Sequence, residues 1–122
     1  MARGLRSELP DGYFHATARG VDGEAIYRDE RDYRSFLTLL LGVVNRFGWR
    51  MHALCLMTNH YHLVVEATRP QLSGGFHRLN GLYAQRFNHR HDRRGHLFGD
   101  RFWCAVIDGD EYLAAVCRYV LA

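Results

Sequence analysis

The sequence predicts a single α+β domain spanning residues 1–122, in which helices pack on a four-stranded antiparallel sheet. Four short segments have the alternating or continuous apolar pattern of strands, and three longer segments place apolar residues three or four positions apart, as helices do. Their order along the chain is strand, helix, strand, strand, helix, strand, helix. A chain of 122 residues is long enough to bury one hydrophobic core rather than two.

The first half of the chain supplies three strands and one helix. The expected strands are residues 13–19, 49–57 and 60–66. Between the first two, a helix begins at a cap formed by Asp29 or Asp32 and ends at Gly48. Thr58-Asn59 is expected to connect the second and third strands tightly.

The second half adds two helices and a strand. Pro70 opens a loop into a helix from about Leu72 to Asn88, where three glycines weaken the helical pattern. Residues 102–107 supply the fourth strand, and a third helix runs from about Glu111 to the last residue. The first six elements have the βαββαβ order of the ferredoxin-like fold, whose first and third strands are central neighbours. The additional C-terminal helix then lies near the opposite sheet face or reaches a partner.

Composition narrows the class of partner. The formal net charge is +3, and all 16 basic residues are arginines, whose guanidinium groups suit phosphate binding. No apolar run approaches the roughly 18–20 residues that span a bilayer, so no membrane partner is expected. The N-terminus lacks the apolar region of a signal peptide, which predicts a cytoplasmic protein. Three isolated cysteines are expected to stay reduced.

Two histidines in the third strand form the first candidate site. His60 and His62 are separated by one residue, so both project from one face of a strand while Tyr61 faces the other way. Two imidazoles at this spacing can bind a metal ion and leave positions for a substrate phosphate, whereas closed structural zinc sites need four ligands. Glu66 is a more remote ligand candidate. The same spacing is also common in hydrogen-bonded surface pairs.

A basic segment from Arg78 to Arg101 forms the second candidate site. Arginines supply phosphate contacts and aromatic rings supply stacking surfaces, the usual combination in single-strand binding. The residues expected to bind DNA are Arg78, Arg86, Arg90, Arg93, Arg94, Arg101, Phe98 and Trp103. The alternative is a solvated helix end followed by a basic loop.

A tyrosine near the C-terminus forms the third candidate site. In the third predicted helix, Tyr119 lies at the edge of an apolar arc, where its ring can pack while its hydroxyl stays exposed. The pattern fits a nucleophile or an amphipathic residue at the edge of the core.

Five segments in this order resemble the REP-associated tyrosine transposases, a branch of the single-tyrosine HUH transposases, also called insertion-sequence-200-like transposases. They are residues 13–20 (YFHATARG), 55–66 (CLMTNHYHLVVE), 79–88 (LNGLYAQRFN), 95–102 (GHLFGDRF) and 110–120 (DEYLAAVCRYV). The resemblance covers essentially residues 10–122. Several motifs in the right order are far more specific than any single one.

The resemblance implies an enzyme of DNA transposition that nicks and rejoins hairpin-containing single-stranded DNA. His60 and His62 would bind Mg²⁺ or Mn²⁺, and Tyr119 would attack the scissile phosphate to form a 5′-phosphotyrosine intermediate. Tyr119 would act in its own subunit or in the partner subunit of a homodimer.

Two departures from the family pattern bear on activity. A third metal ligand is expected four residues beyond Tyr119, past Ala122, so the C-terminal end is expected to be truncated or the ligand to come from elsewhere. Gly99 also stands where the family often has glutamine. The alternative functions are a catalytically inactive single-strand or hairpin DNA-binding domain and a hydrolase that uses metal-activated water.

Overall fold

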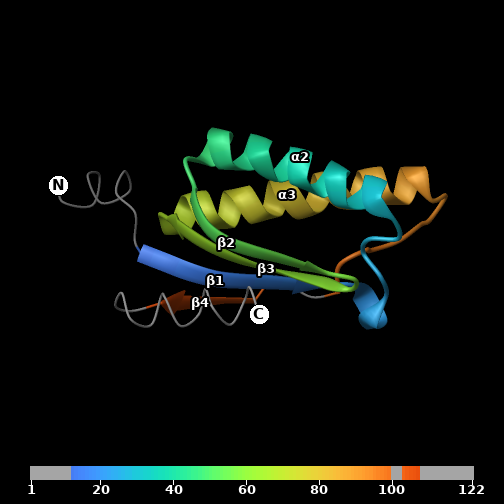
Figure 1. Cartoon of the computed structure of the whole chain (residues 1–122), viewed down its shortest axis with the longest axis horizontal. Coiled ribbons are helices and arrows are strands. Elements are labelled where there is room, and N and C mark those ends of the chain that lie inside the picture. The colour runs from blue at the N-terminus through green and yellow to red at the C-terminus, as the bar shows by residue number, and fades with distance from the viewer. Residues whose placement is uncertain (1–11, 100–102, 108–122) are drawn as a thin grey trace.

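The computed structural model describes residues 12–99 and the strand at 103–107 (Figure 1). The elements are β1 (Gly12–Arg19), a short 3-10 helix η1 (Val21–Gly23), α2 (Glu30–Phe47), β2 (Arg50–Met57), β3 (His60–Ala67), α3 (Arg69–Arg90) and β4 (Trp103–Ile107). The order confirms the predicted βαββαβ pattern. The expected third helix lies outside the described residues.

The four strands form one antiparallel sheet in the order β2-β3-β1-β4. β1 and β3 are therefore the central pair, as the ferredoxin-like prediction requires. Helices α2 and α3 both cover the same face of this sheet (Figure 1). Within the described part of the chain, no helix has the length and apolar character needed to cross a membrane.

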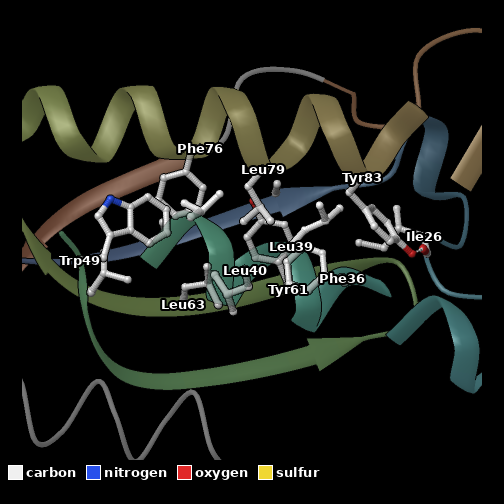
Figure 2. Packing of buried hydrophobic residues seen from close by; sticks show 14 of the residues in the cluster. Ile26, Phe36, Leu39, Leu40, Trp49, Tyr61, Leu63, Phe76, Leu79 and Tyr83 are labelled. Carbon is white, nitrogen blue, oxygen red and sulfur yellow. Dashed lines mark hydrogen bonds between the residues drawn. The ribbon is translucent and has the colours of Figure 1, made fainter. Parts of the chain in front are cut away.

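The hydrophobic core fills the space between the sheet and these helices. Alternate residues of β1 and β3 point into it, among them Phe14, Tyr61 and Leu63, all at most 1% exposed. Phe36 of α2 and Tyr83 of α3 meet them there, with ring centroids 5.3 Å apart and perpendicular planes (Figure 2). The remaining residues of β1 and β3 face away from the helices. Most of them are partly exposed, but Val64, on the same face as His62, is also fully buried.

Helix α2 begins and ends where the sequence predicts. The side chain of Asp29 accepts a hydrogen bond from the backbone N–H of Asp32 at 3.1 Å, which makes Asp29 the N-cap. Gly48 closes the helix in the left-handed conformation with φ of 68°, which glycine adopts without steric cost.

Helix α3 begins earlier than predicted, and the loop expected at Pro70 is wrong. Thr68 and Gln71 form a reciprocal capping box, and Pro70 lies in the first helical turn, where its missing N–H costs no hydrogen bond.

The glycines of α3 reflect packing rather than a weak helix. A Cβ atom on Gly75 would lie 2.3 Å from Cζ2 of Trp49, and the Trp49 indole donates a hydrogen bond to the Gln71 carbonyl at 2.9 Å. Glycine therefore lets the indole pack against the helix backbone.

Candidate active site

The two candidate metal ligands lie on the sheet face that α2 and α3 leave uncovered. In β3, Tyr61 is fully buried toward the helices, whereas His60 and His62 are half-buried on the other face. Their ring centroids are 4.9 Å apart and the rings are nearly perpendicular, with an interplanar angle of 83°. The strand geometry therefore brings both imidazoles together outside the hydrophobic core.

A third histidine, which sequence reasoning did not assign to the site, joins this pair from β1. Nε2 of His15 lies 3.0 Å from Nδ1 of His62, and the two ring centroids are 5.1 Å apart. The alternation of β1 indicated which face His15 occupies. Its place beside His62 depends on the pairing of β1 with β3, where Thr17 is opposite His62.

Contacts at Nδ1 hold the rings of His60 and His62 in place. Nδ1 of His60 lies 2.7 Å from Oδ1 of Asn59, so this nitrogen donates to the amide oxygen. Nδ1 of His62 is in contact with His15. The contacts at Nδ1 orient both rings, as hydrogen bonds to the second ring nitrogen do for histidines that bind metal ions.

The electrostatics of the site favour neutral imidazoles. Burial lowers the pKa of His15, His60 and His62 below the usual value of 6.5. The positive charge of Arg19 further lowers the pKa of His60 and of His62. Neutral rings at pH 7 keep a nitrogen lone pair for a metal ion.

The described residues provide no larger metal site. Among the side chains of residues 12–99, which the structure describes, no group of three or more His, Cys, Asp or Glu residues could hold a metal ion. Glu66 instead contacts Nε2 of His52 at 3.3 Å. It lies four residues along the strand from His62, about 13 Å away, which is too far for both to bind one ion.

Two tyrosines of the described chain are poor candidates for a nucleophile. Tyr61 and Tyr83 are buried on the helix side of the sheet, where their hydroxyls donate to Asn80 and to the Ile26 carbonyl. Burial raises the pKa of both phenols far above its usual value.

Two other tyrosines bear on the site. Tyr13 lies on the same face of β1 as His15, and its ring packs against the His52 ring with centroids 5.0 Å apart. The candidate nucleophile Tyr119 lies outside the described residues.

The predicted DNA-binding residues fall into distinct environments. Arg78, Arg86 and Arg94 are exposed. Phe98 is half-buried, and its ring packs against Tyr61 at a centroid distance of 6.1 Å. Arg101 lies outside the described residues, and the side chain of Trp103 also lies outside the part that is described.

Two of the predicted DNA-binding arginines bind carboxylates of the same chain. Arg90 pairs with Asp29 at 2.5 Å and with the buried Asp32 at 2.7 Å. Arg93 pairs with Glu24 at 2.7 Å. These pairs attach the end of α3 and the start of the following loop to the segment around the start of α2. DNA contact by either arginine stays a prediction.

The loop after α3 returns to the end of the sheet where His60 lies. The backbone N–H of Val21 donates to the Leu97 carbonyl at 2.8 Å, and that of Gly99 donates to the Arg19 carbonyl at 3.0 Å. Arg19 is in turn the cross-strand partner of His60. The fold therefore brings the basic loop, residues 91–99, and the histidine pair to one end of the sheet.

This combination of a ferredoxin-like sheet, a histidine pair on the face away from α2 and α3 and an adjacent basic loop defines the class of protein. Residues 11–122 match the family model described as transposase IS200-like. The chain belongs to this transposase family, and the family resemblance predicted from sequence is confirmed.

Comparison with solved structures confirms the fold. The chain is similar to a REP-associated tyrosine transposase bound to a REP hairpin, with 14% identity and a TM-score of 0.69 over 92% of this chain. It spans 66% of the length of that transposase. It is also similar to a Deinococcus radiodurans R1 protein assigned as a transposase, with 18% identity and a TM-score of 0.60 over 89% of this chain and 88% of the other. A search of curated proteins found no match.

Proposed function

We propose that this chain nicks and rejoins single-stranded DNA during transposition, through a 5′-phosphotyrosine formed on Tyr119. The observation that carries the proposal is the pair His60 and His62, which lies on the sheet face away from α2 and α3, next to the basic loop. Membership of the IS200-like transposase family supports the same chemistry. The REP hairpin bound to the similar transposase supports a hairpin-containing single strand as the DNA partner.

The donor set fits a divalent ion such as Mg²⁺ or Mn²⁺ that is completed by its substrate. His60 and His62 would hold it, and two neutral nitrogen ligands leave positions for phosphate oxygens and water. When bound, the ion supplies charge stabilisation at the scissile phosphate. His15 and Asn59 orient the two imidazoles, which reduces the freedom lost on binding.

The covalent steps belong to the tyrosine and the DNA. The Tyr119 hydroxyl loses its proton and attacks phosphorus, so that a phenolic O–P bond forms while the bond from phosphorus to the 3′ oxygen breaks. The released 3′ oxygen takes up a proton. Rejoining is the reverse, in which a 3′-hydroxyl attacks the phosphotyrosine and restores the phenol. The link conserves the phosphodiester, so no nucleotide cofactor is needed.

Phosphate contacts along the strand are assigned first to the exposed arginines of α3 and the basic loop. Arg78, Arg86 and Arg94 carry their charge at the surface. Arg90 and Arg93, held by carboxylates, would contribute mainly by positioning the basic loop.

The test is formation of a covalent protein–DNA adduct. Protein, Mn²⁺ and a hairpin-containing single strand are incubated, and the adduct is detected on a denaturing gel. We expect an adduct that Tyr119→Phe and His60→Ala abolish. The matched control is Tyr13→Phe, because Tyr13 lies on the same sheet face as the histidines, and it should leave the adduct intact.

Other outcomes separate the rival functions. An undiminished adduct with Tyr119→Phe removes Tyr119 from the mechanism. Binding that survives both substitutions, with no adduct under any metal, indicates a DNA-binding domain without catalysis. Cleavage without a covalent stage indicates a hydrolase that uses activated water.

A further inference from the structure

An arginine that no sequence motif assigned to the site lies beside the histidine pair. Arg19 is the last residue of β1, is exposed, and is paired in register with His60. It follows His15 and Thr17 at two-residue intervals, so its side chain projects from the same sheet face as both imidazoles. Directly opposed residues on one face have Cβ atoms about 5 Å apart.

The position of Arg19 is fixed by the backbone on both sides. Its carbonyl accepts a hydrogen bond from Gly99 at 3.0 Å, and the next residue, Gly20, donates to the Asn59 carbonyl at 2.8 Å. A Cβ atom on Gly20 would lie 2.0 Å from the Glu24 carbonyl oxygen, so this turn requires glycine. Arg19 therefore presents its side chain from a rigid strand end.

The charge of Arg19 is not neutralised by an ion pair in the described part of the chain. No ion pair joins it to any side chain of residues 12–99, and Glu24, beyond the turn, pairs with Arg93 instead. The Arg19 guanidinium lies on the same sheet face as both imidazoles, directly across from His60. A divalent ion on these imidazoles would be repelled by the guanidinium.

We infer that Arg19 binds a phosphate of the DNA strand at the histidine pair and makes metal binding and DNA binding cooperative. The inference rests on the proposed function. A phosphate bound between the ion and the guanidinium attracts both cations, and this attraction offsets the repulsion between them. Without DNA, Arg19 weakens metal binding, whereas with DNA it strengthens binding of the whole assembly. The two effects have opposite signs, which a purely structural role would not produce.

The metal test measures Mn²⁺ affinity from the electron paramagnetic resonance signal of free Mn²⁺, with and without a short hairpin-containing single strand. Binding by the DNA alone is subtracted. Arg19→Gln should bind Mn²⁺ roughly three- to tenfold more tightly than wild type without DNA, as expected for removing a unit charge beside a divalent ion in a water-like medium. Arg19→Gln should also lose most of the increase in Mn²⁺ affinity that DNA gives the wild type. Arg19→Lys keeps the charge and should resemble the wild type without DNA.

The DNA test uses no metal. Arg19→Gln should reduce the dependence of log affinity on log salt by about 0.7 for one lost phosphate contact to a single strand. The matched control is Arg31→Gln, an exposed arginine of α2 in the helix layer, which should change neither measurement. Circular dichroism and thermal unfolding check that each variant is folded.

The outcomes distinguish failure of this inference from failure of the proposed function. If wild type binds Mn²⁺ through the histidines, as judged by loss in His62→Ala, but Arg19→Gln behaves as wild type with and without DNA, the role of Arg19 is refuted. If wild type binds no Mn²⁺ in either condition, the proposed metal site fails, and the inference fails with it.

Discussion

The buried carboxylate of Asp32 gives a prediction whose size follows from its contacts. Asp32 is 2% exposed and accepts hydrogen bonds from the Arg28 backbone at 2.8 Å, from Arg90 at 2.7 Å and from His91 at 2.8 Å. Asp32→Ala removes all three hydrogen bonds. The Arg28 N–H and His91 lose this partner, whereas Arg90 keeps only its pair with Asp29. Breaking a buried charged pair from one side costs about 3–5 kcal/mol. This is a large share of the roughly 5–15 kcal/mol that stabilises a typical domain.

The assay is equilibrium unfolding in urea, which gives the free energy of unfolding for each variant. Asp29→Ala is the comparison, because Asp29 also pairs with Arg90 but lies half-exposed at the cap of α2. It should cost clearly less. Asp32→Asn, which keeps one acceptor oxygen, should fall between Asp32→Ala and wild type. A loss below about 1 kcal/mol for Asp32→Ala, or an equal loss for Asp29→Ala, would refute this reasoning.

Three further outcomes are expected. His15→Ala should weaken Mn²⁺ binding by roughly 10- to 100-fold, the usual effect of removing a residue that orients a metal ligand, and titration of free Mn²⁺ measures it; unchanged affinity would show that His15 does not orient His62. The pKa of His15 and of His62 is lower in the folded chain than in the unfolded chain, so the unfolded chain binds more protons just below pH 6.5. The neutral imidazoles therefore favour folding above pH 6.5, and this contribution to stability is lost as the pH falls. Urea unfolding at several pH values should show this loss, and His15→Phe should reduce it. Gly75→Ala should lower the melting temperature, since the new methyl group meets the Trp49 ring, while Gly81→Ala, where a Cβ has open space, should leave it equal or raise it.

The parts of the fold that the sequence predicts are those set by local periodicity. Alternation in β1 and β3 correctly separates buried residues such as Tyr61 from the histidine face, and Asp29 and Gly48 mark the ends of α2. The loop predicted at Pro70 is wrong because a proline that opens a loop and a proline in the first turn of a helix have the same local signature. Only the capping residues around Pro70 distinguish the two.

Contacts between distant segments were not accessible in the same way. His15 meets His62 across 47 residues, and Arg90 meets Asp32 across 58, so both contacts depend on strand register and helix packing. The sequence alone does not distinguish Arg90 and Arg93 from Arg78, because it does not show which arginines form ion pairs with carboxylates in the folded chain. The sequence does not assign Arg19 to the site for a related reason, because its neighbour His60 belongs to another strand.

The placement of α2 and α3 on one face of the sheet has a practical consequence for protein engineering. In β1, successive residues are constrained in different ways. Phe14 and Ala16 are constrained by packing volume in the core, whereas His15 and Arg19 lie on the other face, where His15 contacts His62. A library that varies only the odd-numbered positions of this strand should therefore change contacts on the histidine face, such as that between His15 and His62, while leaving the core beneath the helices intact. The same number of changes at the even-numbered positions would sample mainly misfolded chains.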